Sequence, residues 1–158
     1  MSEINNVVIQ GAGALGALYA SKFHDSGQFS VALIASGSSY ERIKTNGFLV
    51  NGKHYQIPVI HPDDDPTGAD LIIVALKNHH LLNAVQDLHN IVGENTIIIS
   101  VMNGIDSEEI IGSVYGMDKL LYCIAVGMDA LREGNQTTYQ NRRATNLRSK
   151  RDPPAQTS

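Results

Sequence analysis

Short apolar runs alternate along the chain with segments whose apolar residues recur at helical spacing. Uninterrupted runs of β-branched and other apolar residues are typical of strands that are buried on both faces of a sheet. Predicted strands of this kind cover residues 4–10, 29–35, 70–76, 96–101 and 120–126. Between the third and fourth of them, Leu81, Val85 and Leu88 lie three and four residues apart, which predicts a helix.

The alternation of strands and helices predicts an α/β fold with a doubly wound parallel sheet. Parallel neighbours need crossover connections, and right-handed crossovers place helices on both faces. Weaker signals predict a helix that ends at Gly27, a helix over 40–46, strands over 48–50 and 55–60, a helix over 105–114 and an edge strand over 137–139. Ligands of such sheets bind beyond the carboxyl ends of the strands, so the residues that follow each strand are the first site candidates.

The first predicted strand runs into Gly11-Ala12-Gly13-Ala14-Leu15-Gly16, which matches G-x-G-x-x-G. In that pattern the first glycine allows a tight turn, the second lets the backbone approach a pyrophosphate, and the third lets the helix pack closely on the strand. The free N–H groups at the helix start then favour phosphate. This context predicts a Rossmann-type dinucleotide-binding domain in which the whole turn contacts the coenzyme. The alternative is a packing turn that binds no ligand.

The end of the second predicted strand bears on the choice between NAD and NADP. An NAD-selective site usually has an acid there to hold the ribose 2′-hydroxyl. The first acid is Glu41, inside the following helix, whereas Ser36, Ser38 and Ser39 can donate hydrogen bonds to a 2′-phosphate and Arg42 could supply charge. The sequence therefore favours NADP as the cofactor.

Two further strand ends carry candidate binding residues. Lys77 follows the third long strand and could hold coenzyme phosphates or a substrate carboxylate; the alternative is a surface lysine. Asn103, followed by Gly104, could bind the coenzyme and the substrate, cap the next helix, or do both. We interpret His79 and His80 as surface residues at a helix start.

Composition narrows the class of protein. The 158 residues are 42% hydrophobic and 18% charged, with a formal net charge of −4, which argues against a nucleic-acid partner. No apolar run approaches the roughly 20 residues of a membrane helix, so we expect no membrane partner. The one cysteine, Cys123, excludes an internal disulfide, and no metal site is expected. These features predict a soluble, cytoplasmic protein.

Charge is concentrated at the end of the chain. Residues 1–141 contain seven Lys or Arg against fifteen Asp or Glu, whereas residues 142–158 contain five against one. The latter segment has one large apolar residue, Leu147. We therefore expect a dinucleotide-binding domain over 1–141 and a disordered basic tail over 142–158, for which a shifted reading frame is one hypothesis.

These strand ends together resemble the N-terminal domain of ketopantoate reductase (2-dehydropantoate 2-reductase). The resemblance covers about residues 4–141 and is specific, because a lysine and an Asn-Gly pair recur at the family's intervals. The matching segments are VVIQGAGALGALYA, LIIVALKNHH, ISVMNGIDSEEII and LLYCIAVGMDALREGNQTTYQN.

The resemblance implies an oxidoreductase that reduces ketopantoate to pantoate with NADPH, in pantothenate biosynthesis. It places Lys77 near the cofactor and Asn103 where cofactor and substrate meet. The family's general acid is a lysine of a helical C-terminal domain, which we expect to be absent, so we assign no catalytic residue. Members commonly have arginine at the position of Ser36, which weakens the case for NADP.

Three functions remain open at this point. The first is a truncated NADPH-dependent reductase that binds its cofactor but turns over little or no 2-keto acid alone. The second is a non-catalytic NADP(H)-binding module that acts through a partner chain. The third is a non-functional truncation product. The sequence leaves the oligomeric state open.

Overall fold

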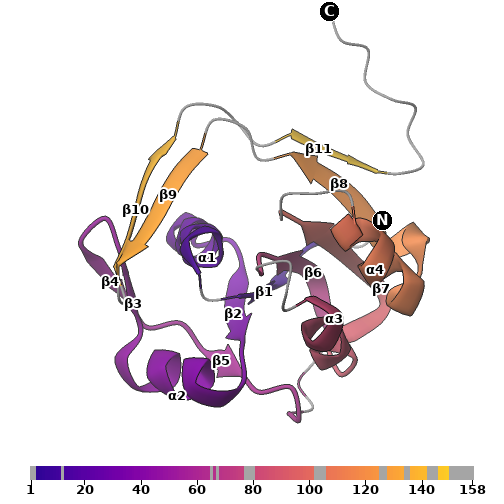
Figure 1. The fold of residues 1–158 in the computed structure, drawn as a ribbon, viewed down its shortest axis with the longest axis horizontal. Coiled ribbons are helices and arrows are strands. Elements are labelled where there is room, and N and C mark those ends of the chain that lie inside the picture. The colour runs from indigo at the N-terminus through magenta and orange to yellow at the C-terminus, as the bar shows by residue number, and fades with distance from the viewer. Residues whose placement is uncertain are drawn as a thin grey trace, which may run out of the picture.

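The computed structural model describes residues 3–11, 13–64, 66, 68–76, 81–101, 106–124, 128–133, 136–141 and 146–149. Two β-sheets and the helices that pack on them make up this part of the chain (Figure 1). None of the described helices is long and apolar enough to cross a lipid bilayer.

The larger sheet has seven strands in the order β11-β8-β7-β6-β1-β2-β5. Every neighbouring pair is parallel except β8 and β11, which are antiparallel. The predicted doubly wound parallel sheet is therefore confirmed. The strands are β1 (Asn6–Gln10), β2 (Ser30–Ile34), β5 (Val59–Ile60), β6 (Ala69–Val74), β7 (Val92–Ser100), β8 (Leu120–Ile124) and β11 (Asn146–Ser149).

The direction in which strands are added reverses at β1. The chain first moves outward from β1 through β2 to β5, and then returns to β6 on the other side of β1 and continues through β7 to β8. Sheets wound in this way bind ligands outside the carboxyl ends of the strands at the point of reversal. The strand order thus directs attention to the ends of β1, β2 and β6.

Helices cover both faces of this sheet (Figure 1). One face carries α1 (Ala14–Ser26), and the other carries α3 (Leu81–Ala84), the 3₁₀ helix η2 (Val85–Leu88) and α4 (Asp106–Tyr115). The chain also forms α2 (Gly37–Asn46) after β2 and the 3₁₀ turn η3 (Met117–Lys119) before β8.

Side chains of β1 alternate between two hydrophobic cores. Val7 and Ile9 belong to the core beneath α1, whereas Val8 belongs to the core beneath α3, η2 and α4. Successive side chains of a strand point to opposite faces, so an uninterrupted apolar run is what a strand covered on both faces requires.

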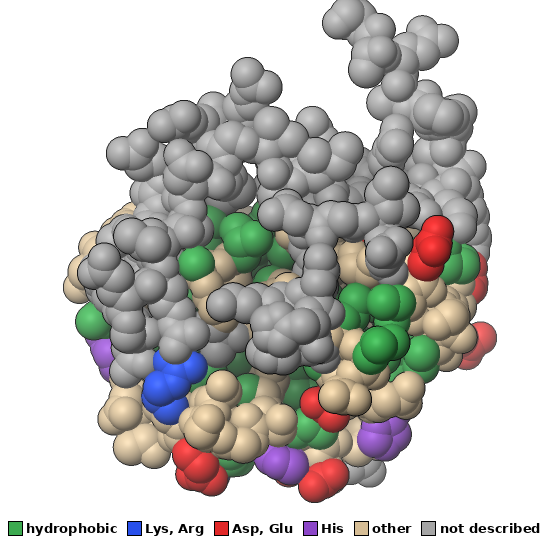
Figure 2. Space-filling model, viewed as in Figure 1, with side chains coloured by type: hydrophobic (Ala, Val, Ile, Leu, Met, Phe, Trp, Pro, Cys, Tyr) green, Lys and Arg blue, Asp and Glu red, His purple; other side chains and the backbone are tan. Residues whose placement is uncertain are grey.

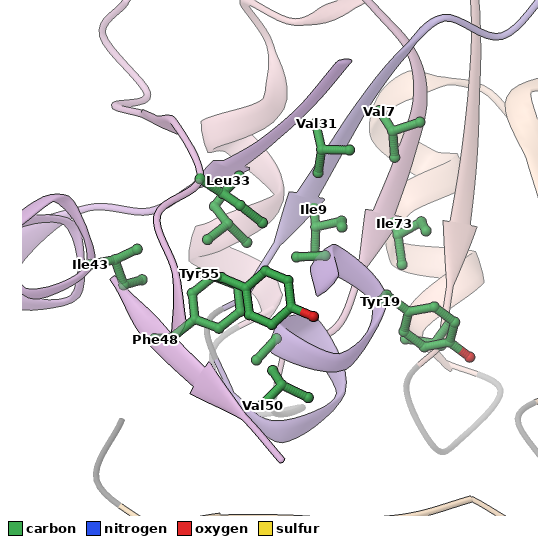
Figure 3. Close-up of a cluster of buried hydrophobic side chains, with 14 of the residues drawn as sticks. Val7, Ile9, Tyr19, Val31, Leu33, Ile43, Phe48, Val50, Tyr55 and Ile73 are labelled. Carbon is green, nitrogen blue, oxygen red and sulfur yellow. The ribbon is translucent and has the colours of Figure 1, made fainter. Parts of the chain in front are cut away.

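A smaller sheet, in the order β4-β3-β10-β9, covers the outer side of α1. Its strands are β3 (Phe48–Val50), β4 (Lys53–Tyr55), β9 (Met128–Glu133) and β10 (Gln136–Asn141). Phe48 and Tyr55 stack with ring centroids 5.5 Å apart and lie in one core with Ile9 and Leu33 of the larger sheet (Figure 3). Because α1 lies between two sheets, all residues over 16–21 are buried.

Two predicted elements differ from the structure. Predicted strand 55–60 is divided, because Tyr55 ends β4 in the smaller sheet while β5 begins after Pro58, which lacks an N–H for a sheet hydrogen bond. The periodic segment from Leu81 does form helix, but as two four-residue pieces, and β7 already begins at Val92.

The last strands also differ from expectation. The predicted edge strand over 137–139 is part of β10, which pairs with β3 and the unpredicted β9 in the smaller sheet. In the segment expected to be a tail, β11 pairs antiparallel with β8, and Leu147 lies opposite Cys123. Of these pairings, that of β10 with β3 joins residues 87 positions apart (136 − 49 = 87), a separation that local patterns do not encode.

Asp70 offers a test of how β6 holds the start of β1. Its Oδ2 accepts hydrogen bonds from the backbone N–H of Asn6 (2.8 Å) and of Asn5 (2.9 Å), and these bonds, that of Asn6 foremost, hold the pKa of the Asp70 carboxyl below its ordinary value. We predict that Asp70→Ala lowers the free energy of unfolding in urea by about 1–2 kcal/mol at pH 7.

The pH dependence of this stabilisation follows from the lowered pKa. It is present above the ordinary aspartate pKa of about 4 and is lost as the pH falls through the lowered pKa of the folded state. Asp63→Ala is the control, because the Asp63 side chain is 90% exposed. Equal stability of the two variants at pH 7 would contradict the assigned role of Asp70.

Candidate functional site

The first glycine of the motif occupies a position where a side chain cannot fit. Gly11 directly follows β1 and has φ +111°, and a Cβ there would lie 2.5 Å from the carbonyl oxygen of Ala75. The two segments are held together by the Ala75 N–H, which donates to the Gln10 carbonyl oxygen at 2.8 Å. Steric exclusion therefore requires glycine at position 11.

The other two glycines of the motif have different surroundings. A Cβ at Gly16 would lie 2.0 Å from the Gly11 carbonyl oxygen, so α1 packs directly on the turn. A Cβ at Gly13 would meet no atom within 4 Å. The backbone at Gly13 is thus open to an approaching group, as the motif requires of its second glycine.

At the start of α1, two backbone N–H groups have no hydrogen-bond partner among the residues that the structure describes. Gly13 is the residue before the first helical one, no side chain caps it, and the first turn contains no acid. The first intrahelical bond runs from the Ala17 N–H to the Gly13 carbonyl oxygen at 3.0 Å. The N–H groups of Ala14 and Leu15 precede that bond, and such groups carry the positive end of the helix dipole.

A pocket of about 470 Å³ opens where β1, β2 and β6 end. Its volume lies within the usual range for small-molecule sites. One wall comes from the end of β2 and the start of α2, the opposite wall from α3 and η2, and the floor from the ends of β1 and β6. The lining residues are Gln10, Gly11, Ile34, Ala35, Ser36, Ser39, Leu76, Asn83, Ala84 and Asp87.

Gln10 forms part of the pocket and has an unsatisfied oxygen. Its side chain is 3% exposed, and its Nε2 donates to the Ala84 carbonyl oxygen at 2.7 Å. Because that partner can only accept, the amide orientation is fixed and Oε1 points away from Ala84. Oε1 is buried and meets no hydrogen-bond partner in the described part of the chain.

Asp87 is the ionisable residue of the described pocket lining. Burial raises the pKa of its carboxyl above the ordinary value, and nearby Asp63 raises it further, while His61 and His89 act in the opposite direction. Figure 2 shows acidic and histidine side chains along the lower edge of the face it presents.

A buried polar chain lies at the carboxyl end of β7. The hydroxyls of Ser100 and Ser107 are 2.9 Å apart, and the Ser107 hydroxyl donates to Glu108 Oε2 at 3.1 Å. All three side chains are buried. These bonds tie the start of α4 to the end of β7.

The structure brings several predicted site residues together. Three of them line the pocket, namely Gly11, Ser36 and Ser39. The segment from Gly13 to Gly16 follows Gly11 in the same turn and begins α1. Arg42 is half-buried on α2 and is not part of the described pocket lining. The remaining predicted residues lie outside the part of the chain that the structure describes: Ala12, Lys77, His79, His80, Asn103, Gly104 and the side chain of Cys123.

Sequence reasoning missed the opposite wall of the pocket. Asn83 of α3 and Asp87 of η2 both line the pocket, but polar residues four positions apart usually indicate a solvent-exposed face. Gln10 gave a clearer signal, because a polar residue that ends an otherwise apolar strand at the carboxyl edge of a sheet lies where ligands bind.

The chain matches the family Ketopantoate reductase PanE/ApbA over residues 7–149. It is 28% identical to the 2-dehydropantoate 2-reductase of Streptococcus pyogenes over 146 residues, which is 90% of this chain and 48% of that protein. It is 32% identical to the 2-dehydropantoate 2-reductase of a Nostoc species over 113 residues, 67% of this chain and 34% of that protein. The chain thus spans about half the length, or less, of these curated relatives.

Solved structures give the same picture of the fold. The putative 2-dehydropantoate 2-reductase of Enterococcus faecalis aligns with a TM-score of 0.74 at 23% identity, covering 90% of this chain and 47% of that one. A ternary structure of D-mandelate dehydrogenase with NADH and anilino(oxo)acetate aligns with a TM-score of 0.75 at 26% identity, covering 90% of this chain and 47% of that one.

Gly16 is closely surrounded and Gly13 is not, so adding one methyl group at each position should change the stability by different amounts. We predict that Gly16→Ala lowers the free energy of unfolding by about 1–3 kcal/mol, because the Gly11 backbone must move. Gly13→Ala, with φ −75° and open space, leaves the stability unchanged within about 0.5 kcal/mol. Urea unfolding measures both; equal losses would contradict this account of the turn.

Proposed function

Because the chain belongs to the ketopantoate reductase family, we propose that it forms the coenzyme-binding part of an NADPH-dependent 2-dehydropantoate 2-reductase. Residues 1–141 constitute the dinucleotide-binding domain in this proposal, and the basic segment 142–158 follows it and adds β11 to the edge of its sheet. The reaction is the reduction of ketopantoate to pantoate, a step of pantothenate biosynthesis in the cytoplasm.

The observation that carries this proposal is the glycine turn beside the pocket. Glycine is sterically required at positions 11 and 16, whereas a side chain at Gly13 would meet no protein atom. Packing alone therefore accounts for the outer two glycines and leaves the middle one unexplained. A dinucleotide accounts for it, because its pyrophosphate needs close approach to that backbone. The residues present thus fit the coenzyme.

The proposed contacts follow the order of the coenzyme's parts. The pyrophosphate lies over the turn from Gly11 to Gly16, where the N–H groups at the start of α1 donate to it. The adenosine enters the pocket. Its 2′-phosphate meets the wall that contains Ser36 and Ser39, and Arg42 lies about one turn beyond Ser39 along α2. The lack of an acid over residues 36–39 favours NADP over NAD.

Lys77 and Asn103 hold the reacting end in this proposal, as the family resemblance implies. Lys77 directly follows Leu76, a pocket residue, and Asn103 lies two residues beyond Val101, whose N–H donates to the Val74 carbonyl oxygen at 3.0 Å. Both residues are therefore close in sequence to the carboxyl ends of β6 and β7. Asn103 also contacts the 2-keto acid.

We expect these 158 residues to have little or no turnover by themselves. When bound, the reduced nicotinamide supplies the hydride for the 2-keto carbon. The new alkoxide then needs a proton, and the family's general-acid lysine matches no position of this sequence. Proton delivery and substrate positioning each contribute orders of magnitude to rate.

A fluorescence titration tests the proposal. The emission of reduced nicotinamide is followed as the chain is added to NADPH, and separately to NADH; the chain contains no tryptophan to interfere. We expect saturable binding that is tighter for NADPH. Gly13→Val should abolish it by blocking the pyrophosphate, and Gly13→Ala should weaken it less.

The controls make the outcome decisive. Circular dichroism should show that Gly13→Val retains the fold, since its side chain enters open space. A folded, monodisperse chain that binds neither coenzyme would overturn the proposal. Binding that survives Gly13→Val would place the coenzyme away from the glycine turn.

A further inference from the structure

The described lining of the pocket contains one ionisable side chain, and it is an acid. Asp87 lies on the α3–η2 wall, and the facing wall contributes the hydroxyls of Ser36 and Ser39. None of the described residues donates a hydrogen bond to the Asp87 carboxylate. A half-buried carboxylate without a donor favours a ligand group with N–H or O–H and disfavours an anion beside it.

Asp87 is held in place by its neighbours along the chain. Val85 and Leu88 are buried in the core on either side of it. The Ala84 carbonyl oxygen accepts from Gln10 Nε2 at 2.7 Å, and the Val85 carbonyl oxygen accepts from the Tyr115 hydroxyl at 2.5 Å. The backbone that carries Asp87 is therefore fixed from both β1 and α4, as selective recognition requires.

The position of Asp87 in the pocket determines which part of the coenzyme this side chain would contact. With the pyrophosphate at the glycine turn and the ribose at the end of β2, the base extends toward the opposite wall, formed by α3 and η2. Adenine has one exocyclic group that donates hydrogen bonds, its 6-amino group. Asn83 and Leu76 complete this side of the pocket.

We propose that Asp87 is a specificity-determining residue that accepts a hydrogen bond from the 6-amino group of adenine, so that the pocket selects a 6-aminopurine dinucleotide over a 6-oxopurine one. The inference rests on the proposed function. A 6-oxopurine places a carbonyl oxygen opposite the carboxylate, and two acceptors face each other without a proton between them.

The experiment compares NADPH with its reduced 6-oxo analogue, nicotinamide hypoxanthine dinucleotide phosphate, by the same fluorescence titration. We expect the unmodified chain to bind NADPH about tenfold more tightly than the analogue, the lower end for a hydrogen bond to a charged group. In Asp87→Asn the preference should vanish or reverse, because an amide N–H can donate to the 6-oxo group.

Asp63→Asn is the matched control. It removes a carboxylate that influences Asp87 but is 90% exposed and outside the pocket lining, so the preference for NADPH should persist. Circular dichroism and urea unfolding confirm that both variants fold.

Each outcome decides the inference. Equal affinity of the unmodified chain for both dinucleotides overturns the inference. An equal loss of affinity for both dinucleotides in Asp87→Asn also overturns it, because the carboxylate would then contact the ribose that both dinucleotides contain. The proposed function survives in either case. Binding of neither dinucleotide overturns the proposed function and the inference with it.

Discussion

Three segments of the chain meet at Gly11 with no room for a side chain between them. The end of β1 turns there against the Ala75 carbonyl oxygen, and Gly16 of α1 packs on the Gly11 carbonyl oxygen. This close packing makes α1 begin immediately beyond the carboxyl end of the central strand. The N–H groups of the first helical turn are therefore fixed at the edge of the sheet, next to the pocket.

Both sides of the site are held by elements distant in sequence. The smaller sheet covers α1 from outside, so the helix that follows the glycine turn is buried between two sheets. On the other side, the hydrogen bonds of Gln10 to Ala84 and of Tyr115 to Val85 fix the short helices α3 and η2. Preorganised walls reduce the ordering cost of binding a flexible dinucleotide.

The sequence predicted the features that depend on local residue type. Apolar runs gave the parallel strands, and the glycines at 11 and 16 gave the turn, because steric exclusion of a side chain leaves one residue choice. It did not predict the smaller sheet, since the pairing of β3 with β10 joins residues 87 positions apart (136 − 49 = 87), a separation that local patterns do not encode. Asp87 was missed for a related reason: only the fold brings it into the same pocket as Ser36.

The central claim is that a dinucleotide lies across the glycine turn and the end of β2. Backbone amide hydrogen exchange, measured with and without saturating NADPH, tests it most directly. The account predicts slower exchange at Gly13 to Gly16 and at Ala35 to Ser39, with little change in β3 and β4. Coenzyme binding that slows exchange elsewhere and leaves both segments unchanged would contradict it.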